Sequence, residues 1–84
     1  MTLTSLADAH CVIGVKQASK AVRRGEALQV YVAADADARM TKPLRALCSE
    51  QSVPVAQAES MAALGAACGI QVGAAAVAVL GSRR

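Results

Sequence analysis

Apolar residues occur in short runs that are separated by polar residues, glycine or proline. Residues 11–13, CVI, end at Gly14, as is typical of a buried strand followed by a tight turn. Residues 28–34, LQVYVAA, contain β-branched and aromatic side chains and predict the clearest strand. Two further strands are predicted at residues 52–57, SVPVAQ, where Pro54 favours an edge or a strand start, and at residues 74–80, AAAVAVL.

Between these runs, the apolar spacing and the end signals of helices appear. Thr41 and Pro43 are expected to cap and open one helix, so residues 35–43, DADARMTKP, are predicted to be mainly a loop with at most a short helical turn. The predicted helices are residues 2–9, residues 15–24 before Gly25, a helix opening at Thr41 to Pro43 with Leu44, Leu47 and Cys48 on its apolar face, and residues 61–68 after the cap Ser60.

Helices and strands therefore alternate along the chain, beginning with a helix. This order predicts an α/β fold in which helices cover both faces of one sheet. With 84 residues, the chain is expected to form a single domain, residues 1–84, with one modest core. Because Tyr31 is the only aromatic residue, that core must be built from small side chains.

An alternative interpretation applies to residues 61–80, which contain no charged residue. Their length suits a membrane helix, and Gly65, Gly69 and Gly73 repeat at a spacing of four, as in a helix-packing motif. Alanine and glycine contribute little transfer energy, however, and Gln71 interrupts the middle. We therefore expect a buried helix, a turn and a strand, and no association with a membrane.

Cysteine usage points to a reducing, cytoplasmic setting. The three cysteines, Cys11, Cys48 and Cys68, are widely spaced, form no CxxC pair and have only His10 as a histidine nearby. This pattern argues against a disulfide framework or a zinc site, and no metal or cofactor is expected. The first residues also lack the basic segment and apolar run of a secretory signal.

The net charge of +3 is concentrated in one segment. Residues 13–25, IGVKQASKAVRRG, contain four basic residues and no acidic one, whereas the rest has five basic and six acidic residues, a balance of −1. On a helical wheel the basic side chains share an arc opposite Val15, Ala18, Ala21 and Val22. A solvated helix surface is the simpler explanation, but such a surface usually mixes charge signs, so we expect an anionic partner.

The turn before this helix strengthens that expectation. Gly14 lets the backbone bend, so the amides at the helix start can approach a phosphate. Lys16 and Gln17 lie in the first turn, and lysine and glutamine can bind guanine and adenine edges respectively. With so few aromatic residues, base stacking of the RRM or OB-fold type is not expected.

Four segments occur in this order along the chain and carry a resemblance that extends over nearly all of it: IGVKQASKAVRRG, VYVAADADARMTKP, LCSEQSVPV and ESMAALGAACGIQVGAAAVAVL. Together they resemble the ribosomal protein family that binds kink-turn RNA, and most closely its small bacterial, YbxF-like branch. The resemblance implies a three-layer α/β/α sandwich with a mixed four-stranded sheet. This fold agrees with the element order derived above.

The resemblance also implies two RNA contacts. The helix start would meet tandem sheared G·A pairs beside a three-nucleotide bulge, and a loop would cover the flipped-out bulge nucleotide with apolar side chains. Lys16 and Gln17 stand where archaeal and eukaryotic members usually have Asn-Glu, and the bacterial branch resembles this chain in having Lys-Gln. The implied contact residues are Gly14, Val15, Lys16, Gln17 and Lys20, with Arg24 toward the phosphates, and Ile70, Gln71, Val72 and Gly73 in the loop. The charge of Arg23, on the same basic helix, is expected to add electrostatic attraction.

Enzymatic alternatives are weak. Asp35 and Asp37 lack a third ligand for a metal and are expected to form turns and caps. Cys68 has no basic neighbour and is expected in the core. The sequence therefore predicts a monomeric, non-catalytic RNA-binding protein that recognises kink-turn motifs and is ribosomal or ribosome-associated. The alternative is a structural or protein-interaction component without sequence-specific RNA recognition.

Overall fold

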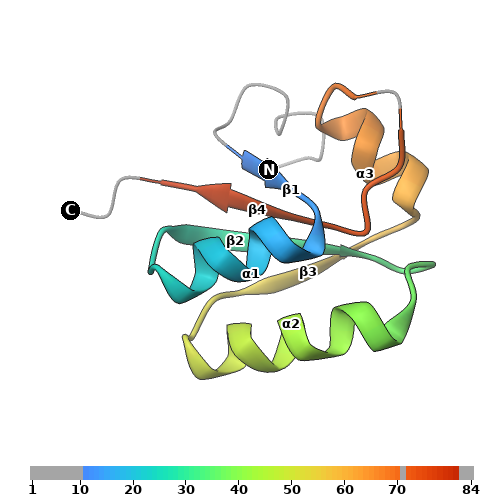
Figure 1. The fold of residues 1–84 in the computed structure, drawn as a ribbon. Helices are drawn as coiled ribbons and strands as arrows, with labels where there is room; N and C mark the ends of the chain where they lie inside the picture. Colours follow the sequence, from blue (N-terminus) through green and yellow to red (C-terminus); the bar gives the residue numbers. More distant parts are fainter. Residues whose placement is uncertain (1–10, 71, 82–84) are drawn as a thin grey trace.

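The computed structural model describes residues 11–70 and 72–81 (Figure 1). The helix predicted at residues 2–9 lies outside this part of the chain. Within it, strands and helices alternate as predicted. They are β1 (Cys11–Ile13), α1 (Val15–Arg23), β2 (Ala27–Ala33), α2 (Ala38–Glu50), β3 (Val55–Ala58), α3 (Met61–Ala67) and β4 (Ala76–Leu80).

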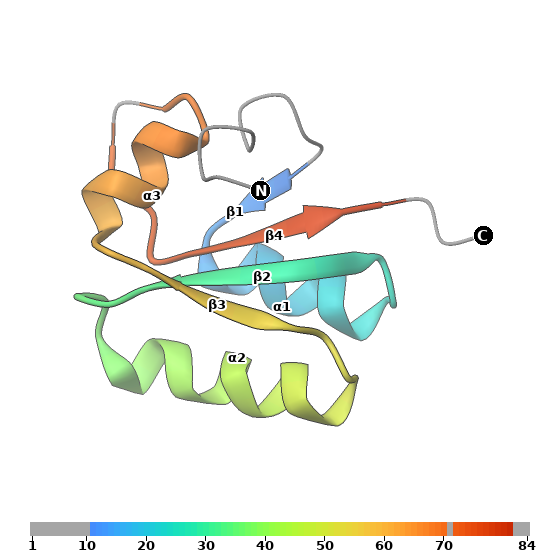
Figure 2. The same cartoon turned by 180° about the vertical axis from the view of Figure 1, so that it is seen from behind.

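The four strands form one mixed sheet in the order β1-β4-β2-β3. β4 runs antiparallel to both of its neighbours, with Cys11 opposite Val79 and Val30 opposite Ala78. β2 and β3 are parallel, as the α2 crossover between them requires. The strand nearest the C-terminus thus lies inside the sheet, between β1 and β2 (Figure 2).

Alternation along the strands creates two cores, one on each face of the sheet. Ala76 and Ala78 of β4 pack with α1 and α2 on one face, whereas Val77 packs with Leu64 of α3 on the other. α1 and α2 lie side by side, and α3 lies apart from them across the sheet (Figures 1 and 2). The three-layer α/β/α sandwich with a mixed four-stranded sheet is therefore confirmed.

Small side chains build these cores, as the composition requires. The largest fully buried side chains are leucine, valine and cysteine, and many of the other core residues are alanine. Thin side chains allow the helices to approach the sheet closely. The largest fully buried side chains are those of Leu44, Leu64, Val22, Val30, Val32, Val77 and Cys48.

The start of α2 differs from the prediction. The helix begins at Ala38, capped by Asp37, whose carboxylate accepts a hydrogen bond of 2.9 Å from the backbone amide of Arg39. Pro43 consequently lies inside the helix instead of opening it. The prediction placed the helix start at Thr41 to Pro43 because proline is favoured in the first turn. The cap at Asp37 instead stabilises a start several residues earlier.

Residues 61–80 are divided between elements, as expected. α3 spans seven residues and β4 spans five, with a turn between them. None of the helices within the described ranges is long and apolar enough to cross a membrane. The glycine repeat therefore does not form one continuous helical stripe.

Candidate nucleic-acid interface

α1 begins at a turn that leaves its N-terminal end open. Gly14, the cap residue, has φ of +106° and ψ of 148°, a conformation that is essentially restricted to glycine, and no side chain caps the helix there. Its carbonyl accepts a 2.9 Å hydrogen bond from the amide of Ala18. A Cβ atom at Gly14 would meet no other described residue within 4 Å, so the turn has free space on this side.

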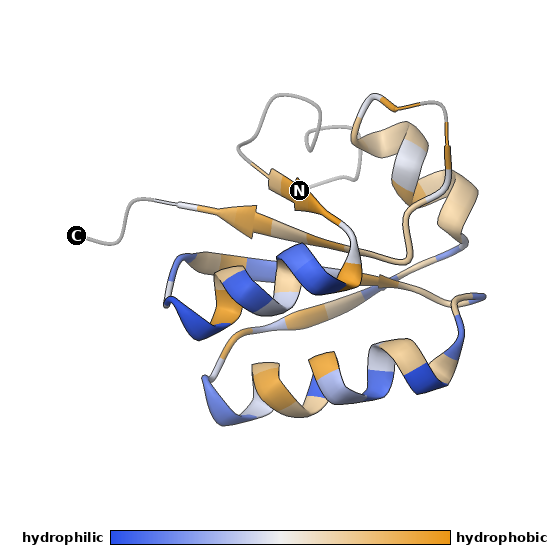
Figure 3. Cartoon of the chain, in the orientation of Figure 1, coloured by the Kyte–Doolittle hydropathy of each residue, from blue (hydrophilic) through white to orange (hydrophobic). Residues whose placement is uncertain are grey.

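The inner face of α1 fixes the direction of its outer face. Ala18, Ala21 and Val22 are buried, so the basic residues at the intervening positions are directed to solvent. Lys16, Gln17, Lys20, Arg23 and Arg24 are all exposed. Hydrophilic bands on α1 mark this surface in Figure 3.

The basic surface has little acidic compensation. Arg24 lies 3.7 Å from the carboxylate of Glu26, in an ion pair between two largely exposed side chains that contributes little to stability. Gln17, Lys20 and Arg24 border a small hollow of about 60 Å³ beside β1 and β4. These three polar groups therefore occupy one side of the helix and can contact one ligand together.

A second surface is formed by Ile70, Val72 and Gly73, which lie in the turn between α3 and β4; we call these three residues the apolar turn. The amide of Ile70 donates to the carbonyl of Gly65 at 3.0 Å, and the amide of Ala74 donates to the carbonyl of Met61 at 3.0 Å. A Cβ atom at Gly65 would overlap the carbonyl oxygen of Val72. Glycine at this helix position thus allows the apolar turn to lie directly on α3.

The apolar turn presents hydrophobic groups to solvent. Val72 is 70% exposed and Met61 is 36% exposed, and the Cβ of Met61 is adjacent to Gly73. Ile70 is half-buried against the core beneath α3. Gln71, which the sequence also implicates, lies outside the described residues.

A hydrogen bond joins the start of α1 to the start of β4, the strand that follows the apolar turn. The amide of Gly14 donates to the carbonyl of Ala76 at 2.8 Å, where the apolar turn passes into β4. The preceding carbonyl, that of Ala75, accepts from the amide of Ala33 at 2.9 Å. The start of α1 and the apolar turn therefore lie at the same end of the sheet, so the structure brings the two predicted contact regions together.

Asp35 and Met61 support the apolar turn, although the sequence did not assign either residue to it. The Asp35 carboxylate accepts a 2.7 Å hydrogen bond from the amide of Met61, and the Ser60 hydroxyl accepts one of 3.0 Å from the amide of Ala63. The strand end thus holds the first turn of α3, on which the apolar turn rests. Met61 follows a recognised cap in the sequence, but only the fold shows that its side chain lies beside Gly73.

The aspartates act as helix caps, as expected. Hydrogen bonds from the backbone amide and then the side chain of Arg39 lower the pKa of Asp37, whose carboxyl is exposed. Among the described residues, no three histidine, cysteine, aspartate or glutamate side chains are gathered as metal binding requires.

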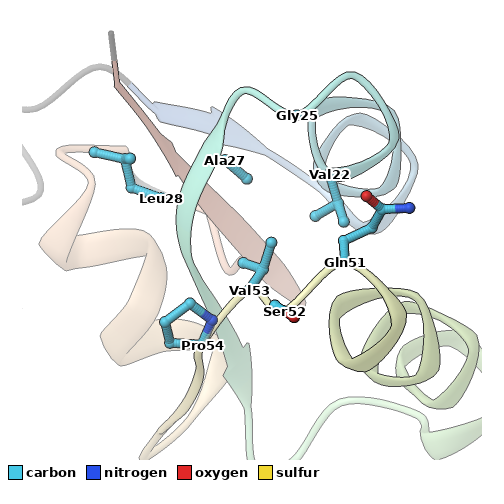
Figure 4. Close-up of a pocket in the computed structure, with 8 residues that line it drawn as sticks. All are labelled: Val22, Gly25, Ala27, Leu28, Gln51, Ser52, Val53 and Pro54. Carbon is cyan, nitrogen blue, oxygen red and sulfur yellow. The ribbon is translucent and has the colours of Figure 1, made fainter. Parts of the chain in front are cut away.

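A depression at the other end of α1 does not belong to these surfaces. It has a volume of about 520 Å³ and opens between the end of α1, the start of β2 and the connection from α2 to β3 (Figure 4). Its lining is formed by Val22, Gly25, Ala27, Leu28, Gln51, Ser52, Val53 and Pro54.

Fold and surface together define a class: a small α/β/α protein with an exposed cationic helix and an apolar turn at one end of its sheet. The chain belongs to the ribosomal protein L7Ae/L30e/S12e/Gadd45 family, whose model matches residues 3–83. The family resemblance seen in the sequence is thereby confirmed.

Three proteins illustrate the relationship. The chain is 52% identical to the RNA-binding protein YbxF of Geobacillus stearothermophilus over 69 residues, which are 82% of this chain and 84% of the relative. The 15.5kD RNA binding protein of Giardia lamblia has a similar structure, with a TM-score of 0.85 and 31% identity, over 95% of this chain and 68% of that one. A protein of unknown function from Bacillus halodurans also aligns, with a TM-score of 0.86 and 26% identity over 95% and 84%.

Proposed function

We propose that this protein is a small, non-enzymatic RNA-binding protein that recognises and stabilises kink-turn motifs, in which tandem sheared G·A pairs adjoin a three-nucleotide bulge. Membership of the family and the names of the relatives in Geobacillus and Giardia support RNA as the partner. The kink-turn is the finer part of the proposal. It rests on the pairing of a cationic helix start with an exposed apolar turn.

The hydrogen bond from Gly14 to Ala76 is the observation that carries this proposal. It holds an open helix N-terminus, suited to a phosphate or a base edge, beside an apolar surface suited to an unstacked base. An uninterrupted duplex does not present an unstacked base beside a phosphate or an accessible base edge. A kinked RNA with an extruded nucleotide presents both.

Each contact residue has a role that follows from its chemistry. Gly14 and Val15 offer the backbone of the turn, while Lys16 and Gln17 offer donors and an acceptor to base edges. Lys20, Arg23 and Arg24, together with the charge of Lys16, attract the phosphate backbone. Ile70, Val72 and Gly73, with Gln71 between them, cover the extruded nucleotide.

The mechanism is selection between RNA conformations. Free RNA exchanges between open and kinked forms, and a protein that binds the kinked form alone shifts the population toward it. No covalent step is required. The protein acts as a monomer in the cytoplasm, on ribosomal or regulatory RNA.

A titration tests the proposal directly. Purified protein is added to a fluorescently end-labelled kink-turn RNA and, separately, to the same RNA with Watson–Crick pairs in place of its tandem G·A pairs. We expect tight binding to the first RNA alone, with a shortened end-to-end distance.

Other outcomes have defined meanings. Equal, salt-sensitive binding to both RNAs would mean that the basic surface of α1 binds phosphates without recognising the kink-turn. Binding to neither would favour a structural or protein-interaction component. The same titration applies to Lys16→Ala, which removes a proposed contact. Lys42→Ala is its matched control, because Lys42 is an exposed lysine on α2.

A further inference from the structure

Two cysteines that are distant in the sequence meet on the α3 face of the sheet. Cys11 lies in β1, and Cys68 is the residue that ends α3. Both are half-buried thiols that pack against the same core cluster, around Leu64 and Val77. Their side chains are hydrogen-bonded to each other. The fold therefore forms a close thiol pair that the spacing in the sequence does not suggest.

The electrostatics of Cys68 agree with this close approach. Burial, the charge that Cys11 carries when ionised, and the hydrogen bond to Cys11 together raise the pKa of Cys68 to about 11. Cys68 is consequently a protonated thiol at neutral pH.

The position of the pair relative to the proposed RNA-binding surface is informative. Cys11 belongs to the strand that leads directly into Gly14, and Cys68 precedes the apolar turn by one glycine. A covalent link between them would join the segments that carry the two proposed contacts. Cys48 is buried in the cluster on the opposite face of the sheet, beneath α1 and α2.

We propose that Cys11 and Cys68 form a reversible disulfide that weakens RNA binding by displacing the apolar turn. This regulation rests on the proposed RNA-binding function. The oxidant is a small disulfide of the glutathione class. Disulfides that form transiently in a reducing compartment are typically of this sensing kind.

The chemistry is a pair of thiol–disulfide exchanges. The Cys11 thiolate attacks one sulfur of the small disulfide, forms a mixed disulfide and releases one small thiolate. The Cys68 thiol then gives up its proton to solvent, and its sulfur attacks the Cys11 sulfur and releases the second small thiolate. Two electrons pass from the protein to the oxidant, and the two protons of the protein thiols end on the two released thiols.

Closing the bond requires one of the two segments to move. The sulfur atoms must come from hydrogen-bonding distance to about 2.05 Å. β1 is held along its length by pairing with β4, at Cys11, Val12 and Ile13. α3 is short, and its last turn carries the apolar turn through hydrogen bonds from Gly69 to Ala66 and from Ile70 to Gly65, both 3.0 Å. The displacement is therefore expected in Ile70 and its neighbours.

The first test measures disulfide formation without RNA. Folded protein is incubated with oxidised glutathione, digested without reduction and analysed by mass spectrometry. We expect a Cys11–Cys68 peptide that has lost two hydrogen atoms, absent from Cys11→Ser and Cys68→Ser and retained in Cys48→Ala. Circular dichroism shows whether each variant is folded. Absence of the linked peptide from the folded wild-type protein would overturn the inference.

The second test compares binding of the kink-turn RNA by reduced and oxidised protein. We expect oxidation to raise the Kd about tenfold, a change that corresponds to about 1.4 kcal/mol, and dithiothreitol to restore it. Cys11→Ser should show no change on oxidation. An unchanged or lowered Kd in protein with the disulfide would overturn the regulatory role. Failure of the reduced protein to bind would instead contradict the proposed function, and the disulfide result would stand independently.

Discussion

Gln17 and Lys20 are exposed neighbours on α1 that differ in what they can recognise. The amide of Gln17 can pair with an adenine edge, whereas the ammonium of Lys20 is a point charge suited to phosphate. Gln17→Ala should therefore lose about 1–3 kcal/mol of discrimination between the kink-turn RNA and its Watson–Crick counterpart. Lys20→Ala should weaken binding to both RNAs alike. Titration of both variants against both RNAs checks this, and equal effects of the two substitutions would contradict the assignment.

Gly14 holds a backbone conformation that a side chain opposes. Since a Cβ atom there would meet no neighbour, Gly14→Ala tests the conformation without a steric clash. We expect a loss of about 1–3 kcal/mol in the free energy of unfolding, because φ of +106° with extended ψ is essentially limited to glycine. Urea denaturation measures the loss. Unchanged stability would mean that the start of α1 adopts an ordinary conformation at no cost.

Cys68 should make the free energy of unfolding depend on pH in the alkaline range. Its pKa is raised from 9.0 to about 11 on folding, so between these values the unfolded chain loses the proton that the folded protein keeps. The free energy of unfolding is therefore expected to fall as pH rises from about 9 to about 11. Urea denaturation across this range should show a flatter dependence for Cys68→Ser. Identical slopes for the two proteins would contradict the raised pKa.

At the scale of elements, α3 and the apolar turn behave as one unit. A Cβ atom at Gly65 would overlap the carbonyl oxygen of Val72 and lie 3.2 Å from the Cα of Gly73. Gly65→Ala should therefore push the apolar turn away from α3 and weaken binding to kink-turn RNA. Ala66→Ser, at an exposed position of the same helix, is the control. Equal Kd values for the two variants, with folding intact, would show that the turn does not contact RNA.

Most elements were predictable because their signals are local. The β-branched and aromatic residues of β2 and the cap Ser60 before α3 act within a few residues, and the structure agrees with both. The start of α2 was not predictable, because Asp37 and Pro43 are competing signals for a helix start. The helix in the structure begins after Asp37. Pro54 precedes β3, so the strand begins later than its apolar pattern suggests.

The site itself was only partly predictable. The cationic face of α1 follows from helical periodicity, but its neighbours depend on contacts between distant segments. The hydrogen bond from Gly14 to Ala76 and the meeting of Cys11 with Cys68 both require β4 to lie beside β1. Periodicity carries no information about strand order, so neither could be read from the sequence by physical reasoning alone.

At the scale of the whole molecule, the basic surface should control salt dependence. Four phosphate contacts by Lys16, Lys20, Arg23 and Arg24 predict a slope of roughly −3 to −4 for the logarithm of affinity against the logarithm of salt concentration. Arg23→Ala should reduce the magnitude of this slope by about 1. Arg45→Ala removes an exposed arginine from α2 and should leave it unchanged. Titrations at several salt concentrations measure both, and matching slopes for the two variants would contradict the assignment.

The interior place of β4 in the sheet also governs the order of events during synthesis. β1 and β2 leave the ribosome early, yet each pairs with β4, which lies nearest the C-terminus of the described strands. The nascent chain cannot close its sheet until residues 76–80 have emerged, and local helices alone cannot bury their apolar faces before then. Because the carbonyl of Ala76 also accepts a hydrogen bond from the amide of Gly14, β4 completes the sheet and the proposed RNA-binding end together.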